Sequence, residues 1–333
     1  MVRVVLGGVV VAFVVSLVAA GSGTPVLAQA KPQKLDFAYI LAPPESGAAA
    51  FKWMAEEVTR RSHATLTVVF HGGTLLNKEL EIMDAVKAGN VAIGSPSGAA
   101  STVFPELGVF LVPYLVRDYA HAYKMFNGEI GRSLDEQFQR KYRLKILLFF
   151  DYGFRHFWNN KRPIAKPDDL KGLKLRVQQG KVFADTVNGL GANAVPMSWS
   201  EVVPAAQQGV IDGADLPIVN INALKIYEVS RYASMTFHNY GPSLVVMNLD
   251  MWKSLTPEAQ KLLTEVSREA QAKVREATES VDNLERAREI LEAKCMKVNA
   301  SDVAAFRKVA EEKVWPLYQK QYAELWDRIV STR

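Results

Sequence analysis

Short apolar runs and amphipathic segments alternate along the first third of the chain. Runs rich in Val, Ile, Phe or Thr predict strands at Lys34–Leu41, Thr65–Phe70 and Val91–Ser95. Between them, apolar residues recur every three to four positions, which predicts helices at Glu45–Arg61 and Glu79–Ala88. Strands that alternate with helices in this order are typical of a parallel sheet with helices on both faces.

The same alternation begins again after residue 163. A nearly all-apolar run, Lys145–Phe150, precedes it and predicts a strand buried on both sides. The elements predicted after it are strands at Leu173–Val177, Ala194–Met197 and Val210–Ala214, and helices at Lys181–Leu190 and Ser198–Gln208. Two such units in tandem predict an α/β protein with two lobes of similar construction.

The last third of the sequence is helical. Thr256 and Pro257 form a typical helix start, and neither Gly nor Pro occurs from Glu258 to Lys294. This stretch predicts one helix of about 55 Å, which either spans both lobes or forms a coiled-coil seam. A heptad spacing holds only over Ala270–Leu284, about two heptads, so the spanning helix is favoured.

The N-terminus has the features of an export signal. Arg3 precedes the apolar run Val4–Ala20, and Ala28–Ala30 has the small-x-small pattern that a signal peptidase cleaves. The alternative is a membrane anchor, but the run is short for a bilayer span and ends in Gly, Ser and Pro. We therefore expect residues 1–30 to be a signal peptide cut after Ala30, and the mature chain to work in the periplasm.

Composition narrows the class of protein further. The 333 residues are 49% hydrophobic and 23% charged, which excludes a disordered chain and a multi-span membrane protein. The net charge of +5 is spread along the chain without a basic tract, so we expect no nucleic-acid partner. The single cysteine, Cys295, excludes an internal disulfide and a cysteine-based zinc site.

No catalytic motif is evident. The five histidines include no pair at i, i+4 spacing, and Cys295 has no adjacent histidine. Gly189–Ala194 matches G-x-G-x-x-A, with Asp212 about twenty residues later, but these glycines close a predicted helix instead of opening one. We interpret them as a helix C-cap, and expect a protein without catalytic activity, metal or cofactor.

Two arginines in apolar surroundings are the candidate binding residues. Arg155 lies in the aromatic segment Tyr152–Trp158, just past the predicted buried strand, and Arg176 lies within the strand Leu173–Val177. Taken alone, Arg176 could point to solvent from an edge strand, because arginine is seldom fully buried.

Several ordered blocks around these arginines resemble one family. They are Phe154–Arg155 with Asn160–Ile164, Asp169–Val177, Pro196–Val202 and Gly209–Ala214, with Gly72–Gly73, Glu79–Glu81 and Val86–Gly89 earlier in the chain. Over about residues 34 to 315, the chain resembles the solute-binding component of tripartite ATP-independent periplasmic (TRAP) transporters, the DctP-type family.

The resemblance implies a two-lobed periplasmic-binding-protein-like α/β fold with a long helix spanning both lobes. Lobe I would comprise residues 31–152 and about 241–280, and lobe II residues 153–240 and about 281–333. The lobes would close over one organic acid and deliver it to the TRAP membrane permease. We expect this solute-binding protein to be a monomer. The alternatives are a periplasmic solute sensor or scaffold and, less favoured, a secreted α/β enzyme.

The family's selectivity arginine, which pairs with the substrate carboxylate, falls on Arg176. The other substrate-binding positions that the resemblance implies are Arg155 as a second arginine, Trp199 packing on the ligand skeleton, Glu79 and Ser97 from the first lobe, and Asp215 with Leu216 in the D-G-A-D-L-P block. A guanidinium suits this role because its planar fork of donors matches a carboxylate and stays charged at physiological pH.

One departure from the family pattern bears on the ligand. Leu216 stands where the family commonly has Asn, and its side chain forms no hydrogen bond. A densely hydroxylated sugar acid is therefore disfavoured. With Trp199, Phe157 and Trp158 expected near the cleft, an apolar or aromatic monocarboxylate or a 2-oxo acid is favoured. A C4-dicarboxylate stays open because Arg155 could hold a second carboxylate.

Overall fold

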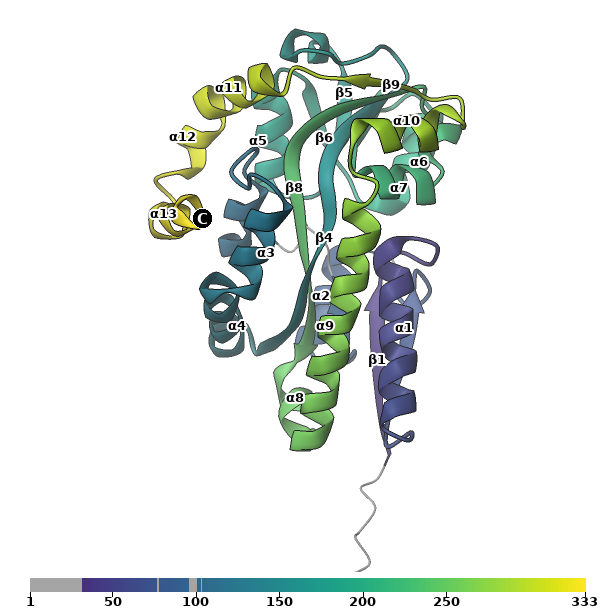
Figure 1. Cartoon of the computed structure of the whole chain (residues 1–333), viewed down its shortest axis with the longest axis vertical. Helices are drawn as coiled ribbons and strands as arrows, with labels where there is room; N and C mark the ends of the chain where they lie inside the picture. The colour runs from purple at the N-terminus through teal and green to yellow at the C-terminus, as the bar shows by residue number, and fades with distance from the viewer. Residues whose placement is uncertain (1–31, 77, 96–100, 103) are drawn as a thin grey trace, which may run out of the picture. The chain divides into compact units, whose positions relative to one another are not determined.

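One sheet of nine strands organises the described part of the chain, which comprises residues 32–76, 78–95, 101–102 and 104–333 of a computed structural model. The strand order is β2-β1-β3-β8-β4-β7-β5-β6, with β9 (Lys297–Ala300) paired to β8. The two central strands, β4 (Leu144–Asn159) and β8 (Tyr232–Asn248), are long and antiparallel (Figure 1). They connect the two ends of the sheet.

Both ends of the sheet are parallel, as the sequence predicts. At one end, β1 (Gln33–Tyr39) pairs with β2 (Leu66–Gly72) and β3 (Ile93–Ser95). At the other, β5 (Lys174–Val177) pairs with β6 (Asn193–Pro196) and β7 (Gly213–Leu216). The alternation of strands and helices does not predict the centre of the sheet, where β8 pairs antiparallel with β3 and β4 and β4 pairs antiparallel with β7.

Helices cover the sheet and connect its strands (Figure 1). The α-helices before the long C-terminal helix are α1 (Ser46–Arg61), α2 (Glu79–Lys87), α3 (Tyr119–Asn127), α4 (Glu129–Tyr142), α5 (Lys181–Leu190), α6 (Trp199–Gln207), α7 (Ile218–Ala223) and α8 (Leu249–Ser254). Short 3-10 helices are η2 (Pro105–Leu111), η3 (Pro167–Leu170) and η4 (Ile226–Glu228), and the C-terminal helices are α11 (Val303–Lys313), α12 (Trp315–Tyr318) and α13 (Ala323–Ser331). The G-x-G-x-x-A segment is the C-cap of α5, as predicted, with Gly191 in the left-handed region at φ +112°.

The single long helix predicted after Pro257 is wrong. The structure breaks it into α9 (Pro257–Glu279) and α10 (Leu284–Glu292), although no Gly or Pro intervenes. Asp282, between the two helices, accepts hydrogen bonds from the Tyr119 hydroxyl (2.5 Å) and the Phe154 amide (3.0 Å). Asn283 then caps α10 by accepting from the Arg286 amide. The tertiary contacts of Asp282 and the local cap formed by Asn283 therefore separate α9 from α10, and hydrophobic periodicity contains no signal for either.

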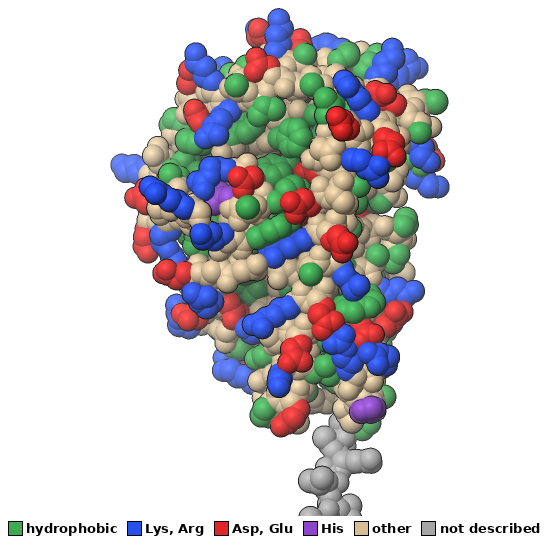
Figure 2. Space-filling view, in the orientation of Figure 1, with side chains coloured by type: hydrophobic (Ala, Val, Ile, Leu, Met, Phe, Trp, Pro, Cys, Tyr) green, Lys and Arg blue, Asp and Glu red, His purple; other side chains and the backbone are tan. Residues whose placement is uncertain are grey.

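Apolar side chains from both ends of the sheet form the core. The sequence analysis places Phe157 and Trp158 near the cleft, but both are fully buried in the core. Phe157 stacks on the His238 ring, with 4.0 Å between the ring centroids. Among the described residues, no helix is long and apolar enough to cross a membrane. Basic and acidic side chains intermingle over the face shown in Figure 2.

Some predictions concern features outside this description. The signal peptide at residues 1–30 and its cleavage after Ala30 lie outside the described residues, as does Ser97. Residues 32–333 belong to one compact unit, and the two-lobe boundaries stay a prediction.

A buried acid on the central strand makes stability depend on pH. Asp151 on β4 is 1% exposed. Burial raises its pKa to about 6, with Asp282 and Glu279 adding to the rise and Tyr240 and Arg275 opposing it. Because the unfolded chain ionises near pH 4, the folded protein binds this proton more tightly. Asp151 therefore contributes stability below about pH 4 that is lost as the pH rises through about 6.

We predict that Asp151→Asn raises the free energy of unfolding at pH 7.5 by about 1–3 kcal/mol, with a smaller gain at pH 4.5. Urea denaturation of both proteins at pH 7.5 and at pH 4.5 measures this difference in the free energy of unfolding. The exposed Asp327→Asn serves as the control and should follow the wild type. A wild-type pH dependence that persists in Asp151→Asn contradicts the assignment.

Candidate ligand site

A cavity beside the central strands gathers side chains from both ends of the sheet. The space between its lining side chains, including the part open to solvent, is about 360 Å³. The lining residues are Ile40, Leu41, Glu79, Tyr152, Arg155, Arg176, Gln178, Trp199, Leu216, Pro217, Asn220 and Leu224. Five of the predicted site residues are in this set, namely Glu79, Arg155, Arg176, Trp199 and Leu216. Asp215 lies behind Arg155 and does not line the cavity.

Arg176 is a buried cation without an acidic partner. It lies on β5 with 1% of its surface exposed, so the alternative of a solvent-facing edge residue is wrong. Its Nε and Nη2 atoms both donate to the Met197 carbonyl, at 3.0 and 2.9 Å. No carboxylate of the described residues lies within 4.0 Å of its guanidinium nitrogens. The Trp199 ring lies 5.7 Å from the guanidinium carbon.

Burial and nearby charges shift the pKa of the Arg176 guanidinium. Burial lowers the pKa of Arg176 to about 10; Arg155 also lowers it, while Glu79 and Asp215 oppose the shift. The group stays charged at neutral pH, and its desolvation is compensated only in part. A bound anion would supply the missing opposite charge.

Arg155, by contrast, already has an acidic partner. Its Nε donates to Asp215 Oδ2 at 2.6 Å, and its Nη2 donates to Asp215 Oδ1 at 2.8 Å and to the Asp215 carbonyl at 2.6 Å. Burial acts to raise the pKa of Asp215, but Arg155 and His238 outweigh it and hold that pKa well below its ordinary value. The two side chains are 2% and 3% exposed, so this is a buried, bidentate ion pair.

The strand that carries Arg155 differs from the prediction. The sequence places Arg155 just past the strand Lys145–Phe150, but β4 continues to Asn159 and contains it. The register shifts between Asp151 and Phe154, and again between Arg155 and Phe157. The apolar run on which the prediction rests stops at Asp151, where the first of these irregularities begins, so a pattern-based prediction ends the strand too early.

Two further polar side chains of the cavity each have one oxygen without a hydrogen-bond partner among the described residues. Glu79, at the start of α2, is 2% exposed, and its Oε2 has no hydrogen-bond partner in the described structure. Burial raises the pKa of Glu79, while the charge of Arg176 lowers it. Asn220 on α7 is 1% exposed, and its Oδ1 is likewise unpartnered within the described residues.

Sequence reasoning missed Asn220, which occupies an ordinary helical position. Its Nδ2 donates to Glu45 Oε1 at 3.2 Å. Glu45 in turn caps α1 and contacts the Tyr39 hydroxyl at 3.3 Å, and that hydroxyl lies 2.9 Å from the Tyr152 hydroxyl. This buried network joins α7 to the opposite end of the sheet, and only the tertiary structure reveals it.

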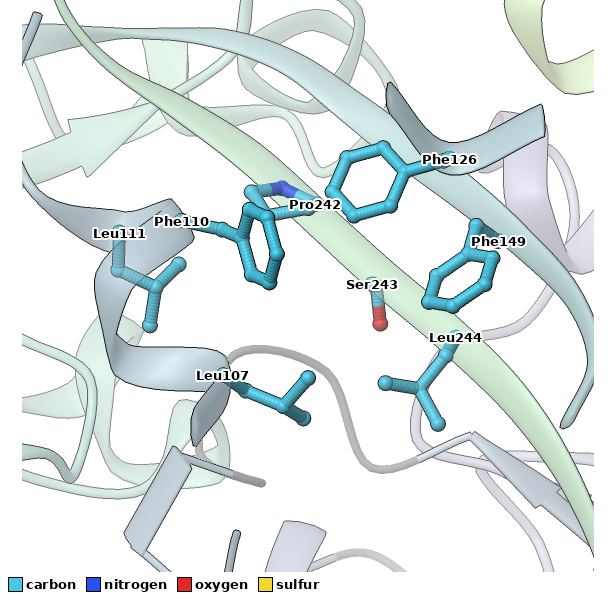
Figure 3. Close-up of a pocket in the computed structure, with 8 residues that line it drawn as sticks. All are labelled: Leu107, Phe110, Leu111, Phe126, Phe149, Pro242, Ser243 and Leu244. Atoms are coloured by element: carbon cyan, nitrogen blue, oxygen red, sulfur yellow. The ribbon is translucent and has the colours of Figure 1, made fainter. Parts of the chain in front are cut away.

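A second cavity has a different character. Its space, including the part open to solvent, is about 310 Å³, and it is lined by Leu107, Phe110, Leu111, Phe126, Phe149, Pro242, Ser243 and Leu244 (Figure 3). These residues include no charged side chain, so the cavity offers nothing to neutralise an acid. Among the described residues, no cluster of three His, Cys, Asp or Glu side chains is arranged to hold a metal ion. The cavity around Arg176 is therefore the candidate site for an anionic ligand.

Comparison with known proteins shows the family to which the chain belongs. The family model of "Bacterial extracellular solute-binding protein, family 7", DctP, matches residues 37–325. The C4-dicarboxylate-binding periplasmic protein DctP of Rhodobacter capsulatus is 34% identical over 266 residues, which is 78% of this chain and 76% of that protein.

Solved structures give the same result. A TRAP periplasmic solute-binding protein from Bordetella bronchispeptica, whose ligand density is assigned to pantoate, superposes with a TM-score of 0.84 at 29% identity, covering 90% of this chain and 99% of that chain. Another, from Sulfurospirillum deleyianum with bound succinate, has a TM-score of 0.83 at 27% identity, covering 91% of this chain and all of that chain.

The Arg155–Asp215 pair generates a stability prediction. Asp215→Asn leaves Arg155 buried without a counter-charge, and we expect it to lower the free energy of unfolding by about 3–5 kcal/mol. The double variant Arg155→Met with Asp215→Asn should recover part of that loss, because no buried cation is then unpaired. Chemical denaturation of the ligand-free protein measures both. If the loss of unfolding free energy in the double variant equals the sum of the losses in Arg155→Met and Asp215→Asn alone, the two side chains are not coupled.

Proposed function

We propose a specific task for this chain, which belongs to the DctP family of bacterial extracellular solute-binding proteins: it captures an organic acid through Arg176 and delivers it to a TRAP-type membrane permease. The observation that carries the proposal is the buried Arg176 guanidinium, which faces a cavity and has no acidic partner among the described residues. A ligand carboxylate would complete its charge and accept its remaining donors. The pantoate and succinate of the two neighbouring structures share that carboxylate group.

Capture would occur by lobe closure. The cavity takes Ile40, Leu41 and Glu79 from one end of the sheet, and Arg176 and Trp199 from the other. A ligand that touches both ends stabilises the closed arrangement over any open one, because only closure brings the two sets of contacts together. Trp199 would pack on the carbon skeleton of the ligand beside the carboxylate.

Delivery requires export of the chain. We propose that the first 30 residues direct the protein to the periplasm and are removed after Ala30, and that the mature protein binds its solute there without catalysing a reaction. Amino-terminal sequencing of protein secreted to the periplasm tests the cleavage position.

Arg176→Met is the decisive variant for this function. We predict that, in wild-type protein, at least one acid among pantoate, succinate and D-glucuronate raises the melting temperature by about 5–10 °C at a concentration of about 100 times Kd. The same acid should give no shift in Arg176→Met, because the variant keeps the aliphatic stem and loses the charged fork. Thermal shift and titration calorimetry measure both effects.

Ligand-free stability separates loss of binding from loss of folding. Arg176→Met removes a desolvated cation, and the buried Glu79, whose pKa burial already raises, can take up a proton once the Arg176 charge is gone. Its free energy of unfolding without ligand should therefore equal or exceed the wild-type value, by up to about 3 kcal/mol. Arg140→Met, on the exposed face of α4, is the control and should bind like wild type. An acid that stabilises Arg176→Met as well as wild type would refute the assignment of the carboxylate site.

A further inference from the structure

We infer that the acid taken by this cavity carries a single carboxylate and at least two hydroxyl groups on a short, otherwise apolar skeleton; this inference rests on the carboxylate site proposed above. Three features carry it: the pairing of the cations, the unpartnered oxygens and the wall's remaining side chains, which apart from Tyr152 and Gln178 are apolar.

The cations of the wall leave room for one carboxylate only. Among the described residues, Arg155 and Arg176 are the only basic ones that line the cavity. Arg155 is neutralised by the bidentate pair with Asp215, to which His238 Nε2 also lies at 3.2 Å. A second ligand carboxylate would therefore be buried without a counter-charge, and next to the acidic side chain of Glu79. The C4-dicarboxylate that sequence reasoning left open is disfavoured by this pairing.

The unpartnered oxygens require hydrogen-bond donors from the ligand. The Asn220 amide has a defined orientation, since its Nδ2 donates to the Glu45 carboxylate and its Oδ1 is consequently the free atom. Glu79 Oε2 is the second buried oxygen without a partner in the described structure. Each is an acceptor when Glu79 is ionised, and a ligand hydroxyl supplies the donor that each one lacks.

This requirement changes the ligand class expected from the sequence. A 2-oxo acid presents only acceptors, and a purely apolar monocarboxylate presents no donor at all, so both leave Asn220 and Glu79 unsatisfied. Leu216, whose side chain forms no hydrogen bond, still disfavours a densely hydroxylated acid. Leu216, Pro217, Leu224, Ile40 and Leu41 together give the cavity an apolar surface. Two hydroxyl groups on a compact aliphatic skeleton fit this wall better than a polyol chain does.

Three acids of one skeleton test the inference on the purified protein by titration calorimetry. Pantoate has one carboxylate, two hydroxyls and a dimethyl carbon; 3,3-dimethylbutanoate lacks both hydroxyls; 2,2-dimethylsuccinate has a second carboxylate in place of the terminal hydroxymethyl group and no 2-hydroxyl. We expect pantoate to bind at least about 30-fold more tightly than 3,3-dimethylbutanoate and at least about 100-fold more tightly than 2,2-dimethylsuccinate.

Side-chain variants assign the preference to its source. Asn220→Leu should weaken pantoate binding about tenfold and leave 3,3-dimethylbutanoate within about twofold of its wild-type affinity. The matched control is Asn222→Leu on the same helix, outside the cavity wall, which should change neither affinity. Circular dichroism and melting curves verify that both variants fold. A pantoate advantage that is unchanged in Asn220→Leu overturns the role of the Asn220 oxygen.

The outcomes separate this inference from the proposed function. If 2,2-dimethylsuccinate or 3,3-dimethylbutanoate binds as tightly as pantoate, and Arg176→Met abolishes that binding, the single-carboxylate, two-hydroxyl class is overturned while carboxylate capture stands. If any of the acids binds equally well to Arg176→Met, the proposed carboxylate site itself fails. If none of the three acids binds to the wild type, the inferred ligand class is wrong.

Discussion

The arrangement of the cavity depends on a positive charge held in the interior without a fixed negative partner. Arg176 has nearly all of its surface buried, and its guanidinium donates to the Met197 carbonyl and lies over the Trp199 ring, with no carboxylate of the described residues within 4.0 Å. Burying a cation in this way is unfavourable for the protein alone, because lost hydration is not repaid by a carboxylate. A bound anion would compensate the desolvation cost of Arg176. The same buried charge that lowers the stability of the ligand-free protein would thus contribute to the free energy of binding.

The rest of the site determines which anion is suitable. The second arginine of the wall is held by an internal aspartate, so that the two cations, although near one another, play different parts. One fixes the geometry of the central strand against β7, and the other remains available to the solute. Asn220, Glu79 and the apolar side chains then define the shape and the hydrogen-bond pattern around a single carboxylate. In the proposed site, specificity would thus come from a few polar groups with unpaired atoms on the closed cavity wall.

Much of this organisation could be predicted from local patterns, and the exceptions have physical reasons. The strands at both ends of the sheet, helix α5 with its Gly191 cap, and the place of Arg176 on a strand follow from periodicity and from family blocks. The length of β4 and all of β8 were missed, because bulges and polar residues interrupt their alternation although the strands are buried between covering elements. The break between α9 and α10 depends on Asp282 contacting Tyr119 and Phe154, which are distant in sequence. The roles of Asp215 and Asn220 were hidden for the same reason, since each depends on a partner more than fifty residues away.

A crystal structure of the protein with a bound acid tests the central claim most directly. The account predicts electron density for the acid in the cavity beside Trp199, with both carboxylate oxygens within about 2.7–3.0 Å of the Arg176 guanidinium nitrogens. Arg155 should meanwhile keep its bidentate pair with Asp215. A structure in which the carboxylate is held by other groups, while Arg176 contacts only the Met197 carbonyl, would contradict the account.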